Sequence, residues 1–327
     1  PAIAVVNKGD TNEAKDRFSE FYRLGVDPMI LVSSEHGGGI PDLREAIRHA
    51  LPELPEMAAS EAPAVAIVGR PNVGKSSLLN KIAGQNRALV SPIAGTTRDP
   101  VDTLIRRGDH EYLLVDTAGI RRRSKVSEAT EELAVMMARR QIERARVVVL
   151  VIDAADGVTS GDLAIAGSAW ELGRAAVVAV NKWDLLDEEG RHRLDETFPR
   201  LDELLSHPPR VNVSALTGRG LDKLFPAIDR ALEAHATELS TSEANRLLEE
   251  AMRRRRPPAV AGKPWKVYYV TQVTTGPPTF MVFANKTLPR GHNYRRYLEN
   301  QVRDALALPG VPVRLVIRGR QKAPKGA

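Results

Sequence analysis

Residues 69–76 have the types and spacing of a phosphate-binding loop. The sequence Gly-Arg-Pro-Asn-Val-Gly-Lys-Ser fits the pattern GxxxxGK[ST] and lies between a predicted strand and a predicted helix. The backbone N–H groups of such a loop and the N-terminus of its helix surround phosphate oxygens. We expect Lys75 to reach the β- and γ-phosphates and the Ser76 hydroxyl to bind Mg²⁺. The predicted phosphate-binding residues are Gly69, Arg70, Pro71, Asn72, Val73, Gly74, Lys75, Ser76 and Ser77.

A second motif, Asp116-Thr117-Ala118-Gly119, lies at the end of the next apolar strand. The Asp116 carboxylate can hold Mg²⁺ through water, and the Gly119 N–H can sense a γ-phosphate. Further along, Asn181-Lys-Trp-Asp184 has the pattern of a base-recognition motif. Guanine presents N1–H and N2–H₂ as adjacent donors, and one carboxylate can accept both.

Adenine lacks this donor pair, so bound ATP would leave Asp184 as a costly unpaired buried charge. The motif therefore predicts GTP and GDP as ligands rather than ATP. We expect Asn181 to brace the pocket, the Lys182 stem to cover the base, and the backbone of Ser214-Ala215 to contact the guanine O6. The predicted base-binding residues are Asn181, Lys182, Trp183, Asp184, Ser214 and Ala215.

The segment Gly95-Thr-Thr-Arg-Asp99 follows the phosphate-loop helix. A threonine there would complete the Mg²⁺ sphere; we favour Thr97 over Thr96, and a polar surface loop is the alternative. The predicted Mg²⁺ ligands are thus Ser76, Thr97 and Asp116, and the catalytic groups Lys75, Thr97 and Gly119. Ile120 stands where many GTPases have a glutamine that orients water, so hydrolysis should need another group, an ion or a partner and be slow alone.

The elements that must position these motifs alternate between apolar strands and helices. Strands are predicted near 64–69, 103–107, 112–116, 147–153, 175–181 and 210–214, with helices at 76–83, 128–144, 160–171, 191–204 and 221–234. Continuous Val, Ile and Leu runs predict an α/β domain with a mostly parallel sheet and helices on both faces.

An internal repeat explains the first residues of the chain. Val-Asn7-Lys8-Gly-Asp10 matches the base-recognition motif, and Ser33–Ile40 matches Ser214–Leu221. We expect residues 1–52, with a helix at Glu13–Leu24, to be the last third of a first such domain whose complete copy spans 63–236. The chain would then be a fragment of a longer protein. Because the phosphate half of the first site is missing, we expect no nucleotide at Asn7, Lys8 and Asp10.

The remaining segments differ in composition. Residues 53–62 read as a Pro- and Ala-rich linker, 237–320 as a small α+β module, and 321–327 as a basic tail. Ser240 and Glu243 form a possible capping box at the module's first helix. From 240 to 327 there are 17 Lys or Arg and 5 Asp or Glu, a net charge of +12, whereas the whole sequence carries +6. This asymmetry fits either an anionic partner or a well-solvated surface.

Other classes are excluded by composition. The sequence has no cysteine, which rules out disulfides, thiolate metal sites and cysteine nucleophiles. There is no apolar run long enough for a membrane span and no basic-then-apolar leader. These features favour a cytoplasmic protein with no membrane partner.

With its motifs in order, the chain resembles the translation-factor-related GTPases of bacteria, and within them the tandem-GTPase Der (EngA) family of ribosome-assembly factors. The resemblance covers nearly the whole chain. It rests on the tandem nucleotide motifs, on Asp116-Thr-Ala-Gly-Ile-Arg-Arg-Arg with basic residues up to Lys125, and on the C-terminal block. That block includes Tyr268–Val273, Pro277–Phe280, Phe283–Asn285 and Tyr294–Arg303.

The resemblance implies a KH-like C-terminal domain, a role in maturation of the large (50S) ribosomal subunit, and contact with ribosomal RNA without DNA specificity. A monomer is expected. Asn72 matches the residue that binds activating K⁺ in related GTPases. The module lacks the GxxG loop with which KH domains clamp a nucleic-acid backbone, which puts the usual RNA surface in doubt. Basic residues, including 253–256, Arg295, Arg296, Arg318 and Arg320, could still meet phosphates, or the module could dock on its own GTPase domain.

Two other functions remain as alternatives. A tRNA-modification GTPase of the TrmE type shares the phosphate-loop Asn and a GTTRD-like segment, but expects a flanking modification domain and commonly a C-terminal cysteine, neither of which is present. The second alternative is a non-enzymatic fragment that only docks on RNA or the ribosome. The complete set of nucleotide motifs argues against it.

Overall fold

The computed structural model describes residues 2–11, 14, 18–34, 36, 38–50, 62–84, 88–92, 102–117, 131–260, 262–289 and 291–319. The chain forms two compact units, Pro1–Glu61 and Ala62–Ala327. The division between them falls in the predicted linker, of which residues 53–61 lie outside the described residues. The finer boundaries at 52, 236 and 320 stay predictions.

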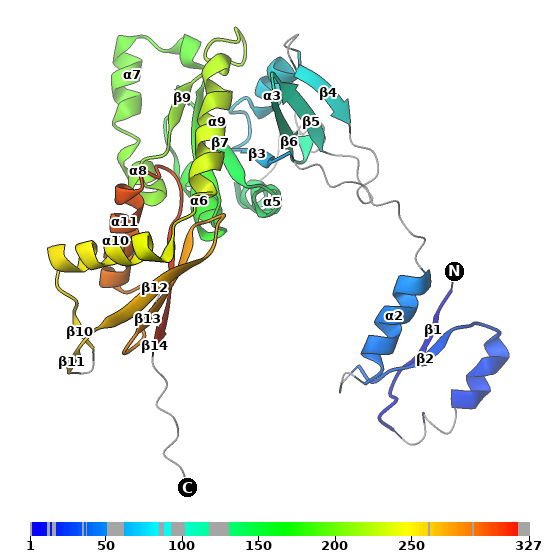
Figure 1. The fold of residues 1–327 in the computed structure, drawn as a ribbon. Helices are drawn as coiled ribbons and strands as arrows, with labels where there is room; N and C mark the ends of the chain where they lie inside the picture. Colours follow the sequence, from blue (N-terminus) through cyan, green and yellow to red (C-terminus); the bar gives the residue numbers. More distant parts are fainter. Residues whose placement is uncertain are drawn as a thin grey trace. The chain divides into compact units, whose positions relative to one another are not determined.

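The first unit contains two short parallel strands, β1 (Ala4–Val6) and β2 (Met29–Leu31), followed by helix α2 (Ile40–Ala50) (Figure 1). The predicted helix at Glu13–Leu24 is described only in its second half. There the structure has a 3₁₀ helix, η1, over Phe18–Leu24. The predicted helix is therefore confirmed in this part, as a 3₁₀ helix.

The second unit is built on a seven-stranded sheet in the order β4-β5-β6-β3-β7-β8-β9 (Figure 1). Its strands are β3 (Ala64–Val68), β4 (Ala88–Pro92), β5 (Thr103–Arg107), β6 (His110–Leu114), β7 (Val147–Asp153), β8 (Ala175–Asn181) and β9 (Arg210–Asn212). The five strands from β6 to β9 in this order are parallel, whereas β4 and β5 are antiparallel additions at one edge. The mostly parallel sheet is confirmed; β4 was not predicted.

Helices cover both faces of this sheet because its central strands are apolar on both sides. Every residue of β7 and β8 is buried. Val147, Val149 and Val151 join a core with α3 (Lys75–Ala83) and α9 (Leu221–His235). The alternate residues of β7 join a second core with α5 (Glu131–Arg144), α6 (Ser160–Glu171) and α8 (Pro199–Leu205). We call this part, from β3 to α9, the seven-stranded domain.

The single helix predicted near Arg191–Leu204 is two helices, α7 (Glu188–Asp195) and α8. Pro199 occupies the first turn of α8. A proline lacks the backbone N–H and clashes with the carbonyl four residues earlier, so it is tolerated at a helix start and breaks a helix interior. The prediction overlooked this residue.

The C-terminal module contains α10 (Thr241–Arg254), a small hairpin of β10 (Ala259–Val260) and β11 (Lys263–Pro264), β12 (Val267–Thr274), β13 (Thr279–Ala284), α11 (Asn293–Ala305) and β14 (Arg314–Gly319). Strand β13 pairs antiparallel with β12 and parallel with β14. Both helices contribute buried leucines, Leu248 and Leu298, to the core beneath this sheet. The predicted capping box is confirmed: the Ser240 hydroxyl accepts from the Glu243 N–H, and the Glu243 carboxylate from the Ser240 N–H.

The module packs directly on the seven-stranded domain, and the two share one hydrophobic core. At the end of α9, His235 Nε2 donates to the Gly173 carbonyl at 2.8 Å, and the His235 carbonyl accepts from the Gly276 N–H at 2.9 Å. Nearby, the Arg303 guanidinium lies 5.0 Å from the centre of the Trp170 ring. Docking of the module on its own domain, one of the two expectations for it, is thus seen in the structure.

Candidate nucleotide-binding site

The loop between β3 and α3 is held in a shape that only glycine permits at two positions. Gly69 has φ 153°, and a Cβ there would lie 2.4 Å from the Val151 carbonyl oxygen. Gly74 has φ 95°, and a Cβ would lie 2.2 Å from Asn181 Nδ2. The loop is therefore wedged between strand β7 and the side chain of Asn181, which explains the glycines of the motif.

Lys75 and Arg70 fix the two ends of this loop. The Lys75 ammonium donates to the Gly69 and Arg70 carbonyls at 2.8 and 2.6 Å. The Arg70 guanidinium pairs with Asp162 and Asp156, each at 3.1 Å. Asp162 is fully buried and also accepts from the Thr159 N–H and hydroxyl at the start of α6. Arg70 thus ties the loop to α6 through its side chain.

Asn181 connects three parts of the predicted site. Its side chain is buried, its Nδ2 donates to the Val73 carbonyl at 2.8 Å, and its Oδ1 accepts from the Ala215 N–H at 2.9 Å. One amide group therefore joins the phosphate loop to the turn that begins at Ser214. Any ligand that spans both elements meets them at a fixed separation.

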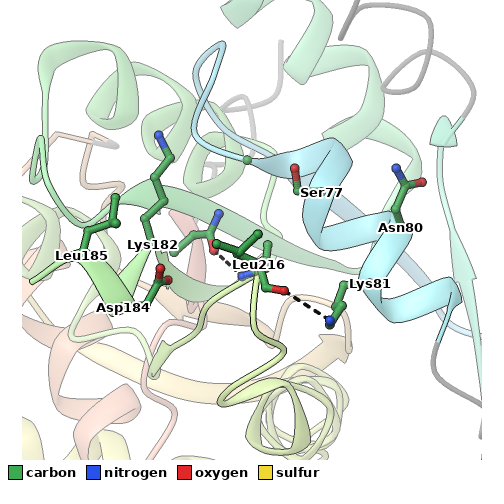
Figure 2. Close-up of a pocket in the computed structure, with 10 residues that line it drawn as sticks. Ser77, Asn80, Lys81, Lys182, Asp184, Leu185 and Leu216 are labelled. Carbon is green, nitrogen blue, oxygen red and sulfur yellow. Dashed lines mark hydrogen bonds between the residues drawn. The ribbon is translucent and has the colours of Figure 1, made fainter.

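A pocket of about 470 Å³ lies beside this junction. Asp184 faces it together with two strongly exposed leucines, Leu185 and Leu216 (Figure 2). Lys81 of α3 donates to the Leu216 carbonyl at 3.2 Å and so joins this helix to the turn. The lining residues are Gly74, Ser77, Asn80, Lys81, Asn181, Lys182, Asp184, Leu185, Ala215 and Leu216. A carboxylate between exposed apolar side chains suits a planar ligand with adjacent donors.

Two residues of the base-recognition motif are fixed by contacts outside the pocket. Lys182 lines the pocket, whereas Trp183 does not. The Lys182 ammonium pairs with the Asp153 carboxylate at 2.5 Å, and Lys182 has a left-handed backbone with φ 62°. The Trp183 ring packs against the second core, with the Arg191 guanidinium 5.4 Å from its centre. Trp183 therefore packs in the fold through its ring, and its predicted contact with the nucleotide stays a prediction.

The Asp116 side chain is oriented by α5. Its carboxylate accepts from Gln141 Nε2 at 2.8 Å, and its backbone N–H donates to Asp102 at 3.0 Å. Asp102 in turn pairs with Arg144, also on α5. Gln141 is buried, with 5% of its surface exposed. The adjacent Thr117 hydroxyl lies 2.6 Å from that of Thr103.

Several of the predicted residues lie outside the described part of the chain. These are the segment with Thr96 and Thr97, Ala118, Gly119 and Ile120. The structure also brings in side chains that the motifs did not indicate, chiefly Gln141, Asp153 and Asp162. Only Asp162 had a local sequence signal, the Thr-x-x-Asp pattern of a helix start, and that pattern says nothing of Arg70.

The first unit repeats the local geometry of the base-recognition half. The Asn7 side-chain oxygen accepts from the Ser34 N–H at 3.1 Å, as Asn181 accepts from Ala215. Lys8 has φ 67°, close to the value of Lys182. Asp10 lies 4.0 Å from His36. The sequence repeat therefore corresponds to a structural repeat.

Comparisons with known proteins identify two domains in the chain. Residues 64–182 match the family of 50S ribosome-binding GTPases, and residues 238–318 match the KH-domain-like C-terminal domain of EngA bacterial GTPase enzymes. A crystal structure of Era from Aquifex aeolicus is 24% identical and covers 78% of this chain and 93% of its own, with a TM-score of 0.39, too low to add to the assignment.

Two full-length relatives are considerably closer in sequence. GTPase Der of Symbiobacterium thermophilum is 45% identical over 331 residues, which are 100% of this chain and 70% of the relative. GTPase Der of Moorella thermoacetica is 42% identical over 98% of this chain and 74% of the relative. With a 50S ribosome-binding GTPase domain, a KH-like module and this identity over the whole chain, the chain belongs to the GTPase Der family of GTP hydrolases.

Proposed function

We propose that the chain uses GTP binding and hydrolysis as a switch in assembly of the large ribosomal subunit, with ribosomal RNA as its contact. The match of residues 64–182 to ribosome-binding GTPases supports the partner. The observation that carries the nucleotide site is the amide of Asn181, which joins the phosphate loop to the base-recognition turn.

GTP selection is assigned to Asp184. Its carboxylate lies at the pocket and is suited to accept both N1–H and N2–H₂ of guanine, and the exposed Leu185 and Leu216 offer apolar surface to a base there. An adenine would bury the same carboxylate without donors, which disfavours ATP. In this structure the Ala215 N–H donates to Asn181 Oδ1, so its proposed contact with the guanine O6 would require that N–H to turn to the base or to be shared with it.

Mg²⁺ fits the residues on the phosphate side. Asp116 offers a carboxylate and Ser76 a hydroxyl, which are the hard oxygen ligands that Mg²⁺ prefers. Among the described residues, no group of three or more His, Cys, Asp or Glu could hold a metal ion. Such a site needs phosphate and water oxygens to be complete, as expected for an ion that binds with the nucleotide. The bound ion would neutralise phosphate charge, and Thr97 is the further proposed ligand.

Gln141 has a defined role in this scheme as a positioning residue. Its amide donates to one oxygen of the Asp116 carboxylate, and the other oxygen would remain available to Mg²⁺. Lys75 is placed for the β- and γ-phosphates, and Gly119 for the γ-phosphate. We propose that Asn72 holds K⁺ beside the phosphates. A cation there would supply positive charge at the phosphates, since Ile120 cannot orient or polarise water.

Helix α9 offers a route from the nucleotide to the module. It begins at Leu221, directly after the turn that contains Ala215, and ends at His235, which bonds to both Gly173 and Gly276. This helix therefore connects the nucleotide pocket directly to the module's docking surface. The net charge of +12 in residues 240–327 suits an RNA partner. No helix in the described residues has the length and apolarity to cross a membrane, and we expect a cytoplasmic monomer.

Co-sedimentation tests this function. The chain is mixed with purified large ribosomal subunits and a non-hydrolysable GTP analogue, GDP or no nucleotide, and the pellet is assayed. We expect more protein in the pellet with the GTP analogue than with GDP. Equal sedimentation in all three states would reject the switch, and no sedimentation in any state would reject the ribosomal partner.

A further inference from the structure

The open face of the β12-β13-β14 sheet carries an unusual concentration of exposed aromatic and apolar side chains. Tyr268 is 52% exposed and Tyr269 42%, and Val273 and Val316 are also exposed. The opposite face is filled by Val270, Val282 and Leu315, which pack in the core under the helices. A contiguous exposed apolar surface of this kind commonly marks a binding site.

Strand register places the aromatic residues in one row. Tyr269 is paired with Phe283, and Phe283 with Arg318. The rings of Tyr269 and Phe283 are stacked, with centroids 4.9 Å apart and an interplanar angle of 11°. The row thus runs from one aromatic ring to the next and ends at a guanidinium group.

A pocket of about 290 Å³ lies at the end of this row. It is lined by Tyr268, Phe283, Ala284, Arg318 and Gly319. Pockets for drug-sized ligands span about 300–1,000 Å³, so this one suits a single small planar group. It combines an aromatic side chain on one strand with a cationic one on another.

Charge selects the kind of partner. The three strands contain no Asp or Glu, whereas β14 places the exposed Arg318 at the pocket. The surrounding residues 240–327 carry a net charge of +12. Aromatic rings on a sheet beside cationic groups are the arrangement that stacks unpaired bases and neutralises their phosphates. An apolar peptide would use the rings but gain nothing from the charge.

We propose that this sheet face binds single-stranded RNA, with bases stacked on Tyr269 and Tyr268 and a base or phosphate held at Arg318. The proposal rests on RNA as the partner in the proposed function and names the surface that contacts it. A stacking platform of this kind needs no GxxG clamp, which this module lacks.

Fluorescence anisotropy with a labelled single-stranded oligoadenylate tests the proposal on the full chain. Tyr269→Leu keeps apolar bulk but removes the aromatic face, and we expect roughly 5- to 150-fold weaker binding. Tyr269→Phe keeps the ring and should bind like the wild type. Arg253→Ala, on the exposed end of α10, is the charge control: it removes a cation outside the sheet face, and a loss of affinity as large as that of Tyr269→Leu would show that charge and not stacking holds the oligonucleotide.

The outcomes distinguish a failure of the proposed RNA-binding surface from a failure of the proposed ribosomal function. If the wild type binds oligoadenylate and Tyr269→Leu binds it equally well, the sheet face is wrong even when the chain sediments with ribosomal subunits. If the wild type binds oligoadenylate through Tyr269 but never sediments with subunits, the sheet face stands and the ribosomal function fails. Tyr269-dependent binding of a proline-rich peptide, without any effect on RNA, would assign the face to a protein partner and overturn the proposal.

Discussion

Asn181→Ala tests the link between the two halves of the nucleotide site. The change removes the donor to the Val73 carbonyl and the acceptor of the Ala215 N–H, at 2.8 and 2.9 Å. Both backbone groups belong to buried residues, and a buried polar group left without a partner costs about 1–3 kcal/mol. We therefore expect the free energy of unfolding to fall by about 2–6 kcal/mol for the pair of groups.

The affinity for GTP should fall as well. Bound GTP must restore the separation of the phosphate loop and the turn, so the loss of the loop bond alone predicts roughly 5- to 150-fold weaker binding. Calorimetric titration with GTP and Mg²⁺ measures this, and thermal melting measures the stability.

The chain offers a matched control for this variant in its own repeat. Asn7→Ala removes the corresponding bond to Ser34 in the other compact unit and should leave GTP affinity unchanged. Asn181→Ala protein that is folded and binds GTP as tightly as the wild type would refute the reasoning.

Three further predictions follow from the same geometry. Gly74→Ala should abolish tight GTP binding and lower the melting temperature, because its Cβ would lie 2.2 Å from Asn181 Nδ2. Gly167→Ala in α6 is the control: its Cβ would have nothing within 4 Å, and the change should stabilise the protein by about 0.5–1 kcal/mol. Equal melting temperatures of the two variants would contradict this. Burial lowers the pKa of His235 from 6.5, so the unfolded chain takes up a proton that the native chain refuses. Stability should be full above about pH 6.5 and fall below it in urea titrations, with a smaller fall in His235→Gln; an unchanged pH dependence in that variant would exclude His235 as the cause. If Asn72 holds K⁺, hydrolysis is faster in KCl than in NaCl, and equal turnover would remove the proposal.

Much of the fold could be predicted because its signals are local. The apolar runs at 147–153 and 175–181 are long enough to indicate strands buried on both faces, and the structure has them as β7 and β8. The phosphate loop has a fixed spacing between a strand and a helix, so Gly69 and Lys75 could be placed from sequence alone. The break at Pro199 was also visible in the sequence, but helical periodicity on both sides concealed it.

The parts that could not be predicted depend on pairing across the fold. Gln141 bonds to Asp116 from 25 residues away, and Arg70 bonds to Asp162 from 92 residues away. No spacing rule connects such positions, since the sheet order alone brings them together. The edge strand β4 was missed for a related reason: five residues with one proline pair only with β5 and have no strong pattern of their own.

The affinities of Asp184→Asn for GTP, xanthosine triphosphate and ATP test the central claim most directly. An asparagine there offers an amide donor to the C2 carbonyl of xanthine and no second acceptor for the guanine amino group. The account predicts that wild-type protein binds GTP far more tightly than ATP or xanthosine triphosphate, and that Asp184→Asn prefers xanthosine triphosphate to GTP. A variant that keeps the wild-type preference for GTP, or a wild type that binds ATP as tightly as GTP, would contradict it.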